Sequence, residues 1–476
     1  MALTSRVMMR KLITRSENKS FSKSFSRTFS NTRTSSISTS SVMEMAAKDG
    51  ELRVFIVSGE VSGDSIASRL MSSLKTLSPF PIRFAGVGGS LMSNEGLQSL
   101  FPMEDIAVMG IWELLPHLSK FKAKLEVATE AAISFQPHIV VTVDSKGFSF
   151  RLLRKLRTNV SAQGSVRPLH FHYVAPSFWA WKGGEARLAG LSEFVDHVLC
   201  ILPFEEEVCR SNGLAATYVG HPILEDMLHL DRETATTPNG WKLRGDGEIF
   251  RRKYGIPSGA TVLTLLPGSR LQEVTRMLPI FSEAMGLLKD SLPELTTVIP
   301  VAPNKHVENY VGTAIREWPV PSILIPGESA NLKFDAFSVR PRKLLFMASK
   351  AALSTSGTVA MELLLARLPC VIAYRAHFVT EWFIRYKAKI PYISLPNILL
   401  DSAVIPEALF SACTSKSLAK FLMQVIQIED NRKKQIDAAE KRLVKPFGMH
   451  FYKKLLFIEL PVTGLAKANL LGQLSS

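Results

Sequence analysis

Cysteine is scarce in this sequence, with four residues in 476, and no two of them form a Cys-x-x-Cys pair. This spacing indicates neither a zinc site nor a disulfide framework, so we expect reduced and mostly buried thiols. Long apolar runs are also missing, because no stretch of about 18 residues is apolar enough to cross a bilayer. With 46% hydrophobic and 21% charged residues, the composition excludes a mostly disordered chain, a collagen and a coiled coil.

Acidic residues are almost absent from residues 1–42, which contain eight lysines and arginines, twelve serines and six threonines but only Glu17. This composition is typical of an organellar transit peptide, mitochondrial rather than chloroplast because arginine is prominent near the start. A disordered tail is the alternative. The segment carries seven of the fifteen net positive charges, so the remaining 434 residues are only mildly basic. They show no basic stripe with interleaved aromatics, so we do not expect a nucleic-acid partner.

Short apolar runs rich in β-branched residues alternate with helix-length segments on both sides of a polar stretch. This alternation predicts parallel sheets flanked by helices, with functional residues at the carboxyl ends of strands. The simplest architecture is α/β, with two Rossmann-like domains facing a cleft. The predicted divisions are a disordered transit peptide over 1–45, an N-terminal domain over 46–230, a linker over 231–250, a C-terminal domain over 251–445, and a helical tail over 446–476 that could pack on the N-terminal domain.

Two candidate sites follow strands of the N-terminal half. In SGEVSGD, a strand runs into two glycines, one on each side of Glu60, and then into a helix. This turn suits a bound ligand, with Ser62 and Gly63 as contacts. A purely structural turn is the alternative, in which Asp64 or Ser62 caps the helix. Asp144 ends the run HIVVTVD, where a carboxylate can accept a proton from a hydroxyl nucleophile. A helix cap is again the alternative.

Two aromatic segments could contact a lipid or a sugar. Trp179 and Trp181 lie in the loop APSFWAWKGG, where they either pack in the core or bind an acyl chain or sugar. Residues 106–125 combine an apolar part, with Met109 and Trp112, and three following lysines. This pattern suits either a membrane surface with anionic headgroups or an ordinary core helix.

The C-terminal half contains two turns suited to a nucleotide diphosphate. In LLPGSRLQEV a buried strand ends in a Pro-Gly-Ser turn, followed by Arg270 and a helix that offers free N–H groups. In STSGTVAMELLL a second helix start offers similar donors, and Glu362 one turn later could accept both hydroxyls of a ribose or simply be solvated. The residues expected to contact the nucleotide here are Gly268, Ser269, Arg270, Glu273, Ser356, Gly357, Thr358 and Glu362.

Several motifs occur together and in one order: SGEVSGD, GVGG followed by MEDIAVMGIWELL, the strand that ends in Asp144, APSFWAW, LPFE, VGHP, LPGSR, SGTVAMELLL and YISLPN. Over roughly residues 53–455 the chain closely resembles the lipid-A-disaccharide synthase family. The long leader suggests a plant organellar version.

The resemblance implies a GT-B glycosyltransferase. It would transfer 2,3-diacylglucosamine from its UDP donor to the 6-hydroxyl of 2,3-diacylglucosamine 1-phosphate, with inversion, giving a β-1,6 disaccharide phosphate and UDP. Asp144 and Glu60 would be catalytic, with Asp144 as the base, and Asn397 would join the residues that contact UDP. No metal or cofactor is expected, since arginine and helix starts can neutralise the diphosphate. Peripheral membrane contact is expected, and a homodimer is compatible with the sequence.

The chain departs from the family pattern beside the expected base. Lys146 and Gly147 stand where the family commonly has a proline and a second acid, and Glu185 stands where it usually has an arginine, with Arg187 two residues later. These positions bear on acceptor recognition and leave the UDP elements intact. Two alternatives remain open: another UDP-sugar transferase or epimerase of the same fold, and a non-catalytic lipid- or nucleotide-binding descendant.

Overall fold

The chain forms two compact α/β units, which we describe separately. The structure is a computed structural model and describes residues 39–106, 118–163, 167–221, 247–292, 294–301, 304–327, 345–355, 359–376 and 378–439. The first unit contains the described residues up to 221, and the second contains those from 247 onward. The predicted tail and most of the predicted linker lie outside the described residues, while a helix begins at Gly247 inside the predicted linker range.

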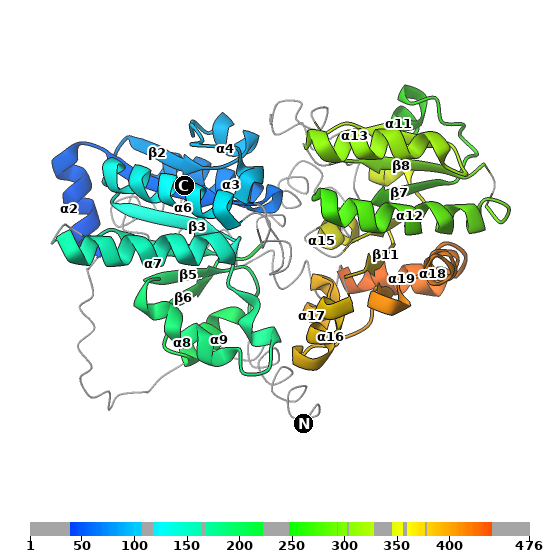
Figure 1. Cartoon of the computed structure of the whole chain (residues 1–476). Helices are drawn as coiled ribbons and strands as arrows, with labels where there is room; N and C mark the ends of the chain where they lie inside the picture. The colour runs from blue at the N-terminus through cyan, green and yellow to red at the C-terminus, as the bar shows by residue number, and fades with distance from the viewer. Residues whose placement is uncertain are drawn as a thin grey trace, which may run out of the picture. The chain divides into compact units, whose positions relative to one another are not determined.

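Six parallel strands form the sheet of the first unit, in the order β2-β1-β3-β4-β5-β6 (Figure 1). The strand order reverses between β1 and β3, which makes their carboxyl ends the switch point of this sheet. The elements are α2 (Thr39–Asp49), β1 (Leu52–Ser58), α3 (Val61–Leu77), β2 (Ile82–Val87), α4 (Ser90–Asn94), η1 (Met103–Ile106), α6 (Leu118–Phe135), β3 (Ile139–Val143), α7 (Lys146–Gln163), β4 (Leu169–Tyr173), η3 (Ser177–Ala180), α8 (Glu185–Ala189), η4 (Gly190–Glu193), β5 (His197–Cys200), α9 (Glu205–Ser211) and β6 (Ala216–Tyr218).

The second unit also has six parallel strands, in the order β12-β11-β10-β7-β8-β9. Here the order reverses between β7 and β10, as in a dinucleotide-binding sheet. The elements are α11 (Gly247–Lys253), β7 (Val262–Leu266), α12 (Leu271–Leu288), β8 (Thr296–Pro300), α13 (Lys305–Ala314), η5 (Ile315–Glu317), β9 (Ser322–Ile325), β10 (Ala351–Ser354), α15 (Val359–Leu365), β11 (Cys370–Tyr374), α16 (Phe378–Lys387), α17 (Leu395–Leu400), β12 (Glu407–Leu409), η7 (Phe410–Ala412), α18 (Ser415–Gln427) and α19 (Glu429–Ala438).

The central strands are buried on both faces, which explains why they appear in the sequence as unbroken apolar runs. In β7, Leu263 and Leu265 pack in one apolar cluster with residues of α12, α13 and α18. Val262 and Leu266 point the other way and pack with residues of α11 and α15. The predicted α/β class with two Rossmann-like units is confirmed.

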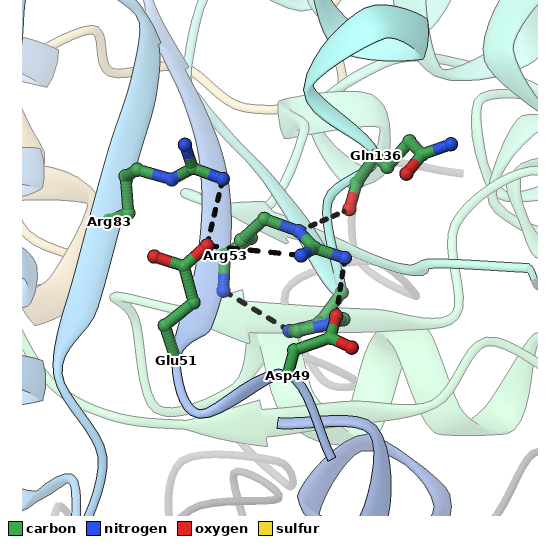
Figure 2. A network of polar contacts seen from close by, with 6 residues as sticks. Asp49, Glu51, Arg53, Arg83 and Gln136 are labelled. Atoms are coloured by element: carbon green, nitrogen blue, oxygen red, sulfur yellow. Dashed lines mark hydrogen bonds and ion pairs between the residues drawn. The ribbon is translucent and has the colours of Figure 1, made fainter. Parts of the chain in front are cut away.

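Helix α2 joins the first sheet through a polar network at the amino end of β1 (Figure 2). Arg53 forms an ion pair with Asp49 across 2.6 Å and donates to the carbonyl oxygen of Gln136 across 2.8 Å. His138 accepts the Arg53 backbone N–H at Nδ1, so its proton lies on Nε2, which donates to Asp49 across 3.0 Å. Because Val42 and Ala46 are fully buried, the predicted transit-peptide boundary at residue 45 falls inside a packed helix.

The four cysteines are buried and free, as expected from their spacing. Among the described residues, no helix has both the length and the apolar character needed to cross a membrane.

Candidate active site

The first unit places Glu60 and Asp144 directly after β1 and β3, at its switch point. Glu60 is the N-cap residue of α3 in an extended conformation, and its side chain makes no capping hydrogen bond. The two loops are in contact, because a Cβ atom added at Gly59 would lie 2.5 Å from the Ser145 hydroxyl oxygen. Open α/β sheets bind their ligands at this position, so these two carboxylates lie where a substrate is expected.

The backbone at the end of β3 is strained. Asp144 and Ser145 have φ angles of 50° and 44°, a left-handed conformation that non-glycine residues adopt at a cost of about 1–3 kcal/mol each. Two hydrogen bonds hold it in place, from the Asp144 N–H to the Tyr173 carbonyl oxygen (3.0 Å) and from the Ser149 hydroxyl to the Asp144 carbonyl oxygen (2.8 Å). The half-buried Asp144 side chain therefore leaves the sheet from a fixed backbone position.

Two cations approach one aromatic ring beside these carboxylates. Lys146 Nζ lies 5.7 Å from the centre of the Phe178 ring, and the Arg187 guanidinium lies 5.9 Å from the same centre. Solvent reaches both cationic side chains. The surrounding protein nevertheless lowers the pKa of Lys146 by partial desolvation, an effect opposed by Asp144 and Glu60 and reinforced by Arg187. The sequence marked Lys146 and Arg187 only as departures from a family pattern, whereas the structure brings them together.

Trp179 is held by a buried glutamate. Its indole N–H donates to Glu205 across 3.1 Å, and its ring packs edge-on against Phe204 at 4.7 Å. Glu205 also accepts the Leu202 N–H, and burial raises its pKa to about 8. Trp181, the other predicted contact, is half buried at the end of the same loop. Glu205 belongs to the LPFE motif, but no pattern in the sequence indicates that it holds Trp179.

The rest of SGEVSGD is structural in large part. The Asp64 carboxylate accepts the N–H groups of Gly89, Leu91 and Met92 at 2.8–3.1 Å, so it caps α4 rather than its own helix. Burial raises the pKa of Asp64 against the opposing effect of these three hydrogen bonds. Gly63 is buried, and a Cβ atom there would lie 2.5 Å from the Ser58 hydroxyl oxygen.

Ser62 is half buried in the first turn of α3. Met109 and Trp112, predicted to contact lipid, lie outside the described residues. Of the lysines that follow them, Lys120 and Lys124 form ion pairs with Asp105 at 2.7 and 2.9 Å. One carboxylate offsets only one of these two positive charges, so the predicted attraction of anionic headgroups stays a prediction.

The second unit places LPGSR after β7, at its own switch point. Gly268 has a φ of 123°, and a Cβ atom there would lie 2.2 Å from the Glu273 carboxylate. The Ser269 N–H and the Thr355 hydroxyl both donate to Glu273. Burial raises the pKa of Glu273 against the opposing effect of Arg270 and of these two hydrogen bonds. Glu273 thus links the loops after β7 and β10, with Arg270 as the N-cap residue of the 18-residue helix α12.

Glu362 lies half buried in the first turn of α15. The preceding residues Ser356, Gly357 and Thr358, predicted to contact the diphosphate, lie outside the described residues.

Asn397 has a structural role in place of the predicted nucleotide contact. Its side chain is fully buried and donates to the Ile405 carbonyl oxygen and to Glu407, both at 2.8 Å. Its amide oxygen accepts the N–H groups of Val404 and Ile405 at 3.0 and 2.9 Å. The amide therefore has no hydrogen-bonding capacity left for UDP. Glu407, which also accepts both N–H and hydroxyl of Ser394, fixes the YISLPN segment and carried no signal in the sequence.

Comparisons with known proteins show which proteins this chain is similar to. The family model for lipid-A-disaccharide synthetase matches residues 54–447. Over 405 residues the chain is 62% identical to a probable mitochondrial lipid-A-disaccharide synthase of Arabidopsis thaliana, covering 85% of each protein. It is 42% identical to the lipid-A-disaccharide synthase of Rhodospirillum centenum, covering 81% of this chain and 88% of the relative.

A solved structure is similar in fold. The UDP-GlcNAc 2-epimerase of Neisseria meningitidis bound to UDP-GlcNAc matches with a TM-score of 0.52 and 11% identity, over 85% of this chain and 99% of that one. At this identity the likeness supports the fold, with two Rossmann-like units, and says nothing about the reaction.

Proposed function

The chain belongs to the lipid-A-disaccharide synthase family and is a glycosyltransferase, and we propose that it joins two acylated glucosamine units with Asp144 as the base. The donor is UDP-2,3-diacylglucosamine and the acceptor is 2,3-diacylglucosamine 1-phosphate. The observation that carries the assignment of residues is that both sheets hold their candidate side chains at the switch point, Asp144 in one and Arg270 in the other.

The chemistry is a single inverting displacement. The oxygen of the acceptor 6-hydroxyl attacks the anomeric carbon of the donor sugar, and Asp144 takes the proton of that hydroxyl. The bond from that carbon to the UDP oxygen breaks, and UDP leaves with the electron pair. The products are the β-1,6 disaccharide 1-phosphate and UDP. The fixed backbone of Asp144 supports this role, since a base must be held within hydrogen-bond reach of the hydroxyl.

The donor is held by the second unit. The N-terminal end of α12 provides N–H groups for the diphosphate, Ser269 provides its hydroxyl, and Arg270 provides a cation. Glu362 accepts the ribose hydroxyls, and residues 356–358 complete the diphosphate contacts. Glu273 orients the Gly268–Ser269 turn through the hydrogen bonds described above. Stabilising the charge on departing UDP lowers the barrier to the displacement.

The acceptor is held by the first unit. Lys146 and Arg187, at one ring beside Asp144, supply two positive charges for the 1-phosphate of the acceptor sugar. Trp179 and Trp181 contact the sugar or its acyl chains, and Glu60 lies near enough to influence Lys146 electrostatically. Ser62 and Gly63, in the first turn of α3 beside Glu60, contact the acceptor or its acyl chains.

The leader and the Arabidopsis relative, described as mitochondrial, both support import into mitochondria. A peripheral membrane location fits two lipid substrates, and a homodimer stays a prediction.

Turnover by the purified chain tests the proposed reaction. We expect UDP and a disaccharide phosphate from the two substrates in detergent, with the new linkage assigned as β by NMR. UDP release without disaccharide would indicate hydrolysis, and conversion of the donor to an isomer would indicate an epimerase. Either result would contradict the proposal.

A further inference from the structure

Helix α16 of the second unit exposes three aromatic side chains within one turn and a half. Trp382 is 68% exposed, Phe383 is 48% exposed and Tyr386 is 60% exposed. Among the residues whose side chains the structure describes, no other phenylalanine, tryptophan or tyrosine is as exposed as these three. We call them the α16 aromatic face. Solvent exposure of three large rings at one place is uncommon in a protein whose surface contacts only water.

The helix spacing explains how the rings gather. Residues four apart lie on the same side of a helix, and the rings of Trp382 and Tyr386 stack with their centres 6.0 Å apart and their planes 7° from parallel. Phe383 lies three positions before Tyr386, a spacing that also places two side chains next to each other on a helix. Its ring therefore widens the patch formed by Trp382 and Tyr386. The rings therefore form one continuous apolar patch.

The neighbouring side of the helix anchors it to the protein. Glu381 pairs with Arg385 at 2.9 Å and accepts the Ser411 N–H at 3.3 Å, and Arg385 donates to the Ser411 hydroxyl at 3.0 Å. Arg385 also lies 5.7 Å from the centre of the Phe410 ring. These contacts attach α16 to the η7 turn without using the three rings. The aromatic face is therefore not needed to hold the helix in place.

The charge around the rings is positive. Lys387 lies 5.4 Å from the centre of the Tyr386 ring, and Lys389 follows two residues later. Glu381, the only acidic residue of α16, is paired with Arg385. Rings bordered by lysines are complementary to an anionic lipid surface, because tryptophan and tyrosine favour the headgroup region and lysines attract its phosphates.

We propose that the α16 aromatic face enters the headgroup layer of a membrane containing anionic phospholipids. This inference rests on the proposed function, because membrane contact would keep the enzyme where its acylated substrates lie. It differs from the sequence expectation, which placed membrane contact at residues 106–125 of the first unit.

Vesicle sedimentation tests the proposal without relying on activity. The full chain is mixed with phosphatidylcholine vesicles that contain or lack phosphatidylglycerol, and compared with the triple variant Trp382→Ser, Phe383→Ser, Tyr386→Ser. The matched control is Leu287→Ser with Ile249→Ser, which removes aliphatic side chains that are 51% and 49% exposed elsewhere in the same unit. Circular dichroism and melting curves establish that all three proteins are folded.

We expect the full chain and the control to bind vesicles containing phosphatidylglycerol, and the triple variant to partition at least about tenfold more weakly. Lys387→Gln should weaken binding to these vesicles and leave binding to pure phosphatidylcholine unchanged. Equal binding by the full chain and the triple variant would overturn the proposal. So would a dimer of the full chain that becomes monomeric in the triple variant without any change in vesicle binding, since the face would then cover a second copy.

The result is separable from the reaction itself. If the proposed function fails, detergent-dispersed substrates are not converted by any of these proteins. If only the membrane proposal fails, turnover in detergent is normal and vesicle binding is insensitive to the three rings.

Discussion

The indole N–H of Trp179 donates to the buried carboxyl group of Glu205 across 3.1 Å, and this bond joins a proposed substrate loop to the N-terminal end of α9. Burial raises the pKa of Glu205 to about 8, whereas its ordinary value is 4.5. Between these values the folded state binds a proton that the unfolded state has released. The contribution of Glu205 to the free energy of unfolding is therefore greatest below pH 4.5 and decreases as the pH rises toward 8.

Glu205→Gln should remove this pH dependence, since glutamine does not titrate. As the pH rises from 5 to about 8, the urea midpoint of the variant should increase relative to that of the unmodified chain. The control is Glu207→Gln, which makes the same substitution at a neighbouring exposed residue of α9. A constant difference in urea midpoint between Glu205→Gln and the unmodified chain would show that the carboxyl group is ionised throughout.

Lys146→Ala should raise the KM for the acceptor about tenfold or more, because a charge-assisted contact with the 1-phosphate is lost. The KM for the donor should stay unchanged. Arg154→Ala is a matched control, because Arg154 lies on the same helix and also faces a ring, that of Phe194 at 4.7 Å. Steady-state kinetics with phosphorylated and dephosphorylated acceptor measures the effect. If the variant still prefers the phosphorylated acceptor as strongly as the unmodified chain, Lys146 does not bind the phosphate.

Asn397→Ala should lower the melting temperature of the second unit. It removes four hydrogen bonds and leaves buried partners unsatisfied, at about 1–3 kcal/mol for each such group. Differential scanning calorimetry measures the change, and UDP should still bind where the variant is folded. A normal melting curve combined with a loss of UDP binding would show that Asn397 contacts the nucleotide, as the sequence suggested.

Removing residues 1–49 should destabilise the first unit, because this deletes α2 and exposes the apolar surface that Val42 and Ala46 cover. Removing residues 1–38 should lower its stability less, because this shorter deletion leaves α2 in place. Thermal unfolding of the two shortened proteins measures the difference. Equal melting temperatures would mean that α2 contributes little to the packing of the sheet.

The positions of the main site residues could be predicted from the sequence because they follow apolar strands. Asp144 and Arg270 each follow a β-rich run, and parallel sheets bring such strand ends to one edge. The roles of Asp64 and Asn397 could not be predicted this way. Asp64 caps a helix about 25 residues away. The Asn397 side chain, in helix α17, bonds to the following turn and to Glu407 of strand β12. Such contacts depend on tertiary packing, which no local pattern records.

The end of the leader could not be located from composition either. Its basic residues end at Arg33 and its serines and threonines continue to residue 41, so composition alone places a boundary at 45. Helix α2 begins at Thr39 within that composition, and only its burial against the sheet distinguishes it from the preceding segment.

The most direct test of the account is the rate of disaccharide formation by Asp144→Asn. Asparagine keeps the size of the side chain and its backbone position but cannot accept the hydroxyl proton as a base. We expect kcat/KM to decrease by about 10²–10⁴-fold while UDP binding, measured by calorimetry, is unchanged. A variant that forms the disaccharide as fast as the unmodified chain would show that Asp144 is not the base.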